Sequence, residues 1–302
     1  MAGASHNMSE TSETSGTSGT SGTSETPALR KMLRVIDAIA ECGSVLVAFS
    51  GGVDSSVLAS LARESGARVL AVTANSELLG ERGLVHATRM AGEIGIAHRI
   101  FRFDVLDQRE FAENPHNRCY HCKKYLVSEL AGIAASEGIR TIADGTNLTD
   151  LTDPTNREDI ASERPGYAAI KEAGVVTPFV DFGLTKSEIR EIAIHLGLSI
   201  ADAPSESCLA TRIPTGTGIT IQKLARIEKA ESILHAHGLH GVRVRVRDCG
   251  RAKNRDRECG HLACVEVQSR DVERFTRLHR GIAEAFETIG FDRVVLSRIR
   301  TL

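Results

Sequence analysis

The sequence predicts an α/β protein with a parallel, doubly wound sheet, followed by a smaller α+β domain. Three observations lead to this fold class. Short apolar runs alternate with amphipathic helical segments over residues 29–197, the pattern of a parallel sheet covered by helices on both faces. A turn rich in glycine and serine joins the first apolar run to the helix after it. Beyond about Thr215 the alternation changes to the order α-β-β-α-β, which indicates a separate domain.

The composition is that of an ordinary soluble chain. Its 302 residues are 41% hydrophobic and 25% charged, enough for one large domain or two modest ones. The chain has 37 Lys and Arg and 39 Asp and Glu, so its net charge is −2. This charge gives no overall attraction to nucleic acid or anionic membrane. No apolar run approaches the roughly 20 residues of a membrane helix, and no export signal is visible. We therefore expect a cytoplasmic protein with no nucleic-acid or membrane partner, whose seven Cys are reduced.

Residues 1–28 form a low-complexity tail. Ser, Thr, Gly and Glu make up nearly all of Ser9–Pro27. This composition lacks core-forming side chains and predicts disorder. Folded structure is expected in two units: residues 29–203 with the parallel sheet, and residues 204–302 with a linker loop and the α+β domain.

The alternating region predicts four strands and five helices. The strands are expected at residues 44–50, 67–74, 97–105 and 139–147, and the helices at residues 29–43, 54–66, 81–95, 122–138 and 185–197. Gly43 is a candidate C-cap, and Thr185 with Glu188 has the spacing of a capping box. Because such sheets bind ligands at the carboxyl ends of their strands, the site should include the loops after Phe49, Thr73, Phe103 and Ala143.

The C-terminal region predicts helices at residues 220–238 and 269–290, and strands at residues 242–248, 261–268 and 292–299. The preceding segment, residues 201–218, is rich in Pro, Ser and Gly and is expected to be an inter-domain loop. On the first C-terminal strand Arg243, Arg245 and Arg247 alternate, so they project from one face. A solvent-facing strand edge would have the same pattern.

The turn Ser50–Ser56, "SGGVDSS", predicts an anion site. Gly51 and Gly52 let backbone N–H groups approach a phosphate, and the following helix begins with a partial positive charge. Hydroxyl groups on three serines add donors. A plain strand-to-helix turn capped by Asp54 or Ser55 is the alternative, but it accounts for a single residue. The Gly-Lys-Ser/Thr of γ-phosphate-cleaving ATPases is absent.

Three cysteines are candidates for sulfur or metal chemistry. Cys119 and Cys122 have the C-x-x-C spacing that allows two thiolates to reach one metal, although two ordinary cysteines at a helix start would look the same. Cys208 lies on the inter-domain loop near Arg212, whose charge would favour a thiolate or bind an anion. A cysteine simply packed in the loop is the alternative.

The turn resembles the PP-loop of ATP pyrophosphatases, which have the adenine nucleotide alpha-hydrolase fold. The resemblance implies that ATP, accompanied by Mg²⁺, adenylates a substrate while the loop holds the departing pyrophosphate. "VTANS" looks like the adenosine side of such a site, and "ADGTN" lies where the family closes over the nucleotide. The implied nucleotide-binding residues are Ser50, Gly51, Gly52, Asp54, Ser55, Ser56, Thr73, Ser76, Gly145, Thr146 and Asn147.

Over almost the whole of residues 29–302 the chain resembles the LarE family. The motifs "AFSGGVDSS", "NRCYHCKK", "ADGTN", "PGYAAIKEAGV", "GLTKSEIREIA" and "PSESCLATRIPTGTGIT" occur in the family's order. The resemblance implies an ATP-dependent sulfur transferase that converts a carboxylate of a pyridinium-biscarboxylate mononucleotide to a thiocarboxylate, for the nickel-pincer cofactor of lactate racemase. It also implies a homo-oligomer, a hexamer in the family.

The resemblance places the family's sulfur-donating cysteine on Cys208. In one branch this cysteine gives up its own sulfur and becomes dehydroalanine. In the other, three cysteines hold a 4Fe-4S cluster whose open iron carries a sulfide. Because this chain has the C-x-x-C, the cluster version is favoured, with Cys119, Cys122 and Cys208 as ligands, while the sacrificial version stays open. The family's phosphate-binding arginines fall on Arg243 and Arg245, and Arg212 is a further candidate.

One segment departs from the family. Residues 247–261, "RDCGRAKNRDRECGH", make a longer, basic hairpin with Cys249 and Cys259. A second metal site with His261 and Cys264 is conceivable, but the spacings match no standard metal signature, so a variable exposed loop is expected.

Two other functions have to be distinguished from sulfur transfer to a small molecule. A tRNA thiolase of the same superfamily would also combine a PP-loop with cysteines, but it should carry a basic footprint for nucleic acid. A nucleotide- or metal-sensing module would have the loop without chemistry at Cys208.

Overall fold

The computed structural model describes residues 26–152, 164–204, 207–248 and 261–300. Its first sheet is parallel throughout, with the strand order β3-β2-β1-β4. The strands are β1 (Ser44–Ala48), β2 (Arg68–Asn75), β3 (Ala97–Arg102) and β4 (Thr141–Ala143). The doubly wound parallel sheet expected from the sequence is therefore confirmed. The proposed tail falls almost entirely on residues 1–25, outside the described residues.

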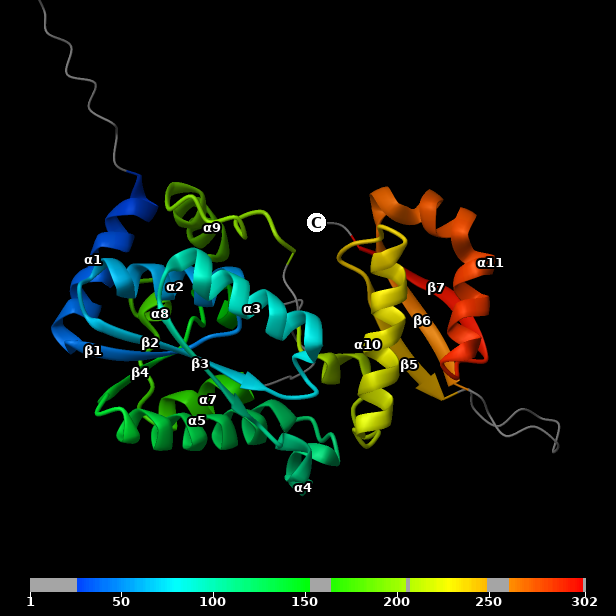
Figure 1. Ribbon diagram of the computed structural model, residues 1–302, viewed down its shortest axis with the longest axis horizontal. Helices are drawn as coiled ribbons and strands as arrows, with labels where there is room; N and C mark the ends of the chain where they lie inside the picture. Colours follow the sequence, from blue (N-terminus) through cyan, green and yellow to red (C-terminus); the bar gives the residue numbers. More distant parts are fainter. Residues whose placement is uncertain (1–25, 153–163, 205–206, 249–260, 301–302) are drawn as a thin grey trace, which may run out of the picture.

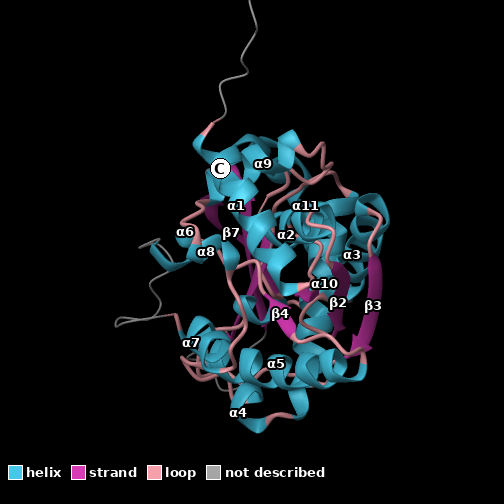
Figure 2. Ribbon diagram, turned by 90° about the vertical axis from the view of Figure 1, so that its left-hand side faces the viewer, coloured by secondary structure: helices cyan, strands magenta, loops and turns pink. Residues whose placement is uncertain are grey.

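Helices lie on both faces of the first sheet (Figure 2), and side chains alternate along β1 between the two cores beneath them. Val45 and Val47 pack into one core, whereas Leu46 packs into another on the opposite face. The first face is covered by α1 (Pro27–Cys42), α2 (Val53–Glu64), α3 (Gly80–Ile94), α8 (Pro178–Asp181) and α9 (Lys186–His195). The second face is covered by α5 (Arg118–Ser136) and α7 (Pro165–Glu172). Helices on both faces leave the ends of the strands open for ligands.

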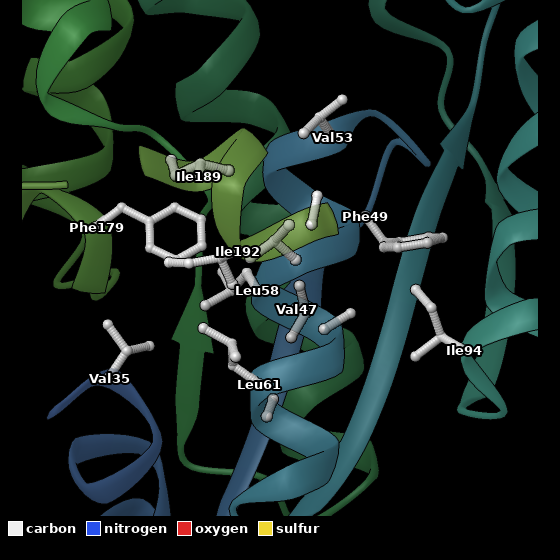
Figure 3. Close-up of a cluster of buried hydrophobic side chains, with 14 of the residues drawn as sticks. Val35, Val47, Phe49, Val53, Leu58, Leu61, Ile94, Phe179, Ile189 and Ile192 are labelled. Carbon is white, nitrogen blue, oxygen red and sulfur yellow. The ribbon is translucent and has the colours of Figure 1, made fainter. Parts of the chain in front are cut away.

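Helices far apart in the sequence meet in the larger core (Figure 3). Leu58 of α2, Phe179 of α8 and Ile189 of α9 are fully buried together. Each such side chain contributes about 1.5–3 kcal/mol relative to exposure. The contacts fix the start of α9 beside the start of α2, where the PP-loop ends.

The second sheet has the order β5-β6-β7, with an antiparallel pair followed by a parallel pair. Its strands are β5 (Arg243–Asp248), β6 (His261–Gln268) and β7 (Arg293–Arg300), packed with α10 (Ile221–Ala236) and α11 (Val272–Thr288). The core of this domain also includes Leu78 and Phe103, which follow β2 and β3. The second domain thus sits against the carboxyl edge of the first sheet (Figure 1).

The predicted elements agree with the observed ones apart from their ends. Gly43 caps α1 at φ +66°, and Thr185 with Glu188 forms the expected capping box. The short helices α4 (Arg109–Ala112), α6 (Leu148–Thr152), α7 and α8 were not predicted. Of these, α4 buries Phe111, and α8 buries Pro178 and Phe179. Neither helix is long enough to show a periodic apolar pattern. None of the helices in the described ranges has the length and apolar character to cross a bilayer.

Candidate functional site

Gly51 makes the sharp turn between β1 and α2 possible. Its φ is +74°, and a Cβ there would lie 2.6 Å from the Cα of Ala87 in α3. Both the left-handed backbone and the contact with α3 therefore exclude a side chain. The turn brings the N-terminus of α2 to the carboxyl edge of the sheet, where its first N–H groups have no helical acceptor.

The serines of the turn surround this helix end. The hydroxyl oxygens of Ser50 and Ser55 lie 3.2 Å apart, and Ser55 also donates to the carbonyl of Gly52 at 3.2 Å. The hydroxyl of Ser56 is buried and has no partner among the described residues. Hydroxyl groups and a helix N-terminus at one point make a site suited to a phosphate group.

Asp54 connects the turn to two other elements. Its Oδ2 lies 2.5 Å from Nζ of Lys186 at the start of α9, and its Oδ1 accepts a hydrogen bond from the buried amide of Asn147 at 3.3 Å. The same amide donates to Asp150 at 2.8 Å. Burial and the nearby charge of Asp54 raise the pKa of Asp150 above its ordinary value. Two carboxylates and one ammonium group thus meet beside the phosphate site.

The loop after β4 is organised by Asp144. Its Oδ1 accepts hydrogen bonds from the backbone N–H and the hydroxyl of Thr146, at 2.9 and 2.5 Å, and its Oδ2 lies 2.7 Å from Nζ of Lys123. Burial alone would raise the pKa of Asp144, but the charge of Lys123 and the Thr146 donors outweigh it and lower that pKa. A Cβ on Gly145 would lie 3.1 Å from the backbone of Asp54 and Ser55, so the loop packs directly on the PP-loop.

The two residues expected on the adenosine side lie at and just beyond the end of β2. Thr73 is buried, donates to the carbonyl of Phe49 at 2.7 Å and lies 2.8 Å from Nε2 of His98. Ser76 accepts a hydrogen bond from the N–H of Leu78 at 3.3 Å. Thr73 therefore supports the turn from behind, and Ser76 shapes the loop that leads toward the second domain.

The three candidate cysteines come from two segments. Cys119 and Cys122 are on the first turns of α5, and Cys208 is the N-cap of the short 3-10 helix Leu209–Arg212. Burial, and then the nearby charge of Cys208, raise the pKa of Cys122 to about 12. Cys122 also packs against the core that includes Leu209 and Ala210, the two residues that follow Cys208. Even so, no three His, Cys, Asp or Glu side chains in the described ranges are grouped closely enough to hold a metal ion.

Arg212 holds the Cys208 loop from inside. Its guanidinium is 5% exposed and forms a bidentate pair with Glu231 of α10, at 2.9 and 3.2 Å. Its Nη1 donates to both the carbonyl and the hydroxyl of Ser207, at 2.8 and 2.7 Å. Expected from the sequence to bind substrate or assist Cys208, Arg212 is engaged here in positioning the residues around that cysteine.

Arg245 reaches the same loop from β5. It lies 2.7 Å from Glu266 and donates to the carbonyl of Thr211 at 2.7 Å. Arg243 and Arg245 are half-buried and Arg247 is exposed, whereas Val244 between them is buried, so the predicted alternation is confirmed. The backbone of Leu209 also donates to the carbonyl of Leu78 at 3.0 Å. Both domains therefore hold the Cys208 loop.

Sequence reasoning missed two cationic side chains of the site. Lys186 was predicted only as part of the helix at residues 185–197, and Lys123 only as part of the helix at residues 122–138. The signal for Lys186 was the "GLTK" that precedes α9, but its approach to Asp54 depends on how α9 packs. The proposed hairpin with Cys249 and Cys259 lies outside the described residues.

Comparison with known proteins adds sequence relationships to this geometry. Residues 37–129 match the asparagine synthase family. The chain is 34% identical to the uncharacterized protein slr1717 of Synechocystis sp. over 85% of this chain and 89% of that protein. It is 28% identical to the pyridinium-3,5-bisthiocarboxylic acid mononucleotide synthase of Lactiplantibacillus plantarum, over 88% and 90% of the two chains.

A weaker match is the tRNA-specific 2-thiouridylase MnmA of Rhizorhabdus wittichii, 29% identical over 62% of this chain and 57% of that protein. Among solved structures, the NMN synthetase of Francisella tularensis is similar over 60% of this chain and 76% of its own, with a TM-score of 0.47 and 18% identity.

Proposed function

Because this chain belongs to the LarE family of PP-loop, ATP-dependent sulfurtransferases, we propose that it converts a carboxylate of pyridinium-3,5-biscarboxylic acid mononucleotide to a thiocarboxylate. ATP activates the carboxylate as an acyl-adenylate, and pyrophosphate is released. Sulfur then attacks the carbonyl carbon and expels AMP. The observation that carries the proposal is the backbone bond between Leu209 and Leu78, which ties the residue after Cys208 to the loop that follows β2.

The PP-loop supplies the groups needed for the first step. The α2 N-terminus, the hydroxyls of Ser50, Ser55 and Ser56, and the ammonium of Lys186 would hold the β- and γ-phosphates as their charge develops. Mg²⁺ usually binds through one or two carboxylates and the substrate's phosphates. Asp54 offers such a carboxylate, and bound Mg²⁺ would neutralise charge on the leaving pyrophosphate.

The second step needs a sulfur nucleophile beside the acyl-adenylate, and Cys208 is exposed on the loop that both domains hold. In the proposed route its Sγ attacks the carbonyl carbon and AMP leaves, giving a thioester. Loss of the Cα proton and cleavage of the Cβ–Sγ bond then yield the thiocarboxylate and dehydroalanine at position 208. The atoms balance without an external oxidant or reductant.

A sulfide carried on a 4Fe-4S cluster is the other source of sulfur. Its ligands would be Cys119, Cys122 and Cys208. As these cysteines lie, they do not make a three-ligand group, so no step is derived through a cluster. Iron and sulfide analysis of anaerobically purified protein distinguishes the two routes. Repeated turnover by an iron-loaded protein would favour the cluster, whereas a single turnover with loss of sulfur from Cys208 would favour sacrifice.

The substrate carries a phosphate and two carboxylates, and arginine binds such groups in a bidentate manner. Arg243 and Arg245 on β5 are the proposed contacts, because Arg245 also bonds to Thr211 in the Cys208 loop. We further propose a cytoplasmic homo-oligomer, a hexamer by family resemblance, whose size light scattering would measure.

The proposal is tested by incubating the protein with ATP and the biscarboxylate mononucleotide. Pyrophosphate release and the mass of an oxygen-to-sulfur exchange are followed together. We expect Cys208→Ala to release pyrophosphate but transfer no sulfur, and Cys42→Ala, which removes an exposed thiol on α1, to behave as wild type. Sulfur transfer by Cys208→Ala would refute the assignment. Sulfur incorporation into tRNA instead of the mononucleotide would establish the thiolase alternative.

A further inference from the structure

Asn114 has a backbone conformation and a burial that the proposed chemistry does not explain. Its φ is +58°, the one left-handed value among the non-glycine residues described, and its side chain is fully buried. Asparagine enters this region more easily than most residues. A buried amide, however, has to find partners for both its donor and its acceptor.

The partners of Asn114 lie on the loop that follows Cys208. Its Nδ2 donates to the carbonyl of Pro214 at 2.8 Å and to that of Thr217 at 2.9 Å, residues about a hundred positions further along the chain. Its backbone carbonyl accepts a bond from the N–H of Gly216 at 2.8 Å. Asn114 therefore binds this loop with both its side chain and its backbone.

The remaining side-chain atom of Asn114 connects to the helix that bears the C-x-x-C. Oδ1 accepts a hydrogen bond from Nη1 of Arg118 at 2.8 Å. Arg118 is the first residue of α5, directly before Cys119, and is 8% exposed. Its Nε is buried and has no partner among the described residues, so a charged side chain with a spare donor lies at the start of the helix that bears Cys119 and Cys122.

We propose that Asn114 and Arg118 form a latch that positions Cys208 against Cys122. The latch joins the segment after Cys208 to the first turn of α5 through side-chain hydrogen bonds. The role of the latch rests on the proposed sulfur transfer, because that reaction needs Cys208 in a defined position. Both residues act through the cysteines and are positioning residues.

Two substitutions of Asn114 separate the latch from the backbone. Asn114→Gly keeps the left-handed φ without strain but removes the amide. Asn114→Asp keeps the shape and the pair with Arg118, but places carboxylate oxygens against the carbonyls of Pro214 and Thr217. Phe286→Leu, which alters a side chain of α11 in the core of the second domain, is the control for a loss of stability alone.

The readout is crosslinking of Cys122 to Cys208 by dibromobimane in the folded protein, identified by peptide mass spectrometry. We expect the link in wild type and in Phe286→Leu, and a rate at least about fivefold lower in both Asn114 variants, because each loses the hydrogen bonds to Pro214 and Thr217. Sulfur transfer should fall with the crosslink, while pyrophosphate release should stay near wild type.

Wild-type crosslinking rates in both Asn114 variants, or no Cys122–Cys208 link in wild type, would overturn the latch. Should neither Asn114 variant fold, Arg118→Lys, which keeps the charge but not the guanidinium geometry, takes their place with the same expected loss. The crosslink needs neither ATP nor the mononucleotide. Failure of the proposed function would therefore appear separately, as an intact crosslink without sulfur transfer.

Discussion

Lys186 places its Nζ 2.5 Å from Oδ2 of Asp54, so the first turn of α9 supplies an ammonium group to the PP-loop. The turn itself has no lysine. A positive charge is needed where pyrophosphate develops negative charge, and this pair keeps one at the edge of the turn. Asp54 holds the ammonium in place.

Replacing Lys186 by Met should slow pyrophosphate release about 10- to 150-fold, since a hydrogen bond to a charged group contributes about 1.5–3 kcal/mol. Steady-state kinetics with varied ATP would measure it. Lys31→Met is the matched control, because Lys31 forms a 2.7 Å pair with Glu188 on the same helix but does not contact the turn. Equal losses in the two variants would argue that Lys186 only stabilises α9.

Gly51→Ala should destabilise the protein and abolish ATP binding. The left-handed φ costs about 1–2 kcal/mol for an alanine. The added Cβ would also press on the backbone of Ala87, and overpacking of this kind costs about 1–3 kcal/mol more. Gly43→Ala isolates the first cost, since Gly43 has φ +66° and open space around its Cβ position. Urea unfolding should show a larger loss of stability in Gly51→Ala than in Gly43→Ala, and ATP titration should show lost binding in Gly51→Ala alone. Similar free energies of unfolding in the two variants would contradict the proposed clash with Ala87.

Arg212 and Glu231 should prove strongly coupled. Removing either partner of a buried ion pair costs about 3–5 kcal/mol, because the other charge is left buried. We expect Arg212→Met and Glu231→Gln each to lose stability of this order, and the double variant to lose less than the sum. A double-mutant cycle by urea unfolding measures the coupling. Additive effects would mean that the pair does not hold the Cys208 loop.

His235, near the end of α10, should make the protein less stable in mild acid. Burial, followed by the charges of Arg82 on α3 and of His240, lowers the pKa of His235 to about 4. The unfolded chain binds a proton near pH 6.5, but the folded chain does so only near pH 4. Burial of neutral His235 therefore costs no stability above about pH 6.5, and the free energy of unfolding decreases as the pH falls from there toward 4.

The free energy of unfolding measured by urea from pH 7 to pH 4 checks this. Its decrease should be smaller in His235→Gln than in wild type. His237→Gln, which changes an exposed histidine two residues further along, at the C-cap of the same helix, should keep the wild-type slope. An unchanged slope in His235→Gln would assign the acid sensitivity to other groups.

The long periodic elements were predictable because their patterns are local. The strand β1, its glycine turn and α2 follow one another directly, so the phosphate site could be inferred from neighbouring residues. The same holds for the capping box at Thr185. The helix α8 is four residues long and exists because Phe179 is buried under α1 and α9. No periodicity within so short a segment could indicate it.

Side-chain partners across the chain could not be predicted in this way. From its position beside Cys208, Arg212 was expected to meet a thiolate or a substrate, yet it pairs with Glu231. Arg245 was expected to bind the phosphate of the substrate, and its side chain donates a hydrogen bond to the carbonyl of Thr211 in the Cys208 loop. Each partner is brought within reach by packing between α10, β5 and that loop, which sequence spacing does not contain.

The amino-acid sequence by itself predicts the parallel sheet and the glycine-serine turn, because each depends on residues close together in the chain, and Cys208 is the candidate sulfur donor through the family's motif. Which cation approaches that turn, and what holds the loop of Cys208, depends on packing. Lys186 and Asp54 are 132 positions apart, and Asn114 and Pro214 are 100 apart. Hydrogen bonds and ion pairs form only within a few ångströms, so contacts between such distant residues exist only after the chain has folded.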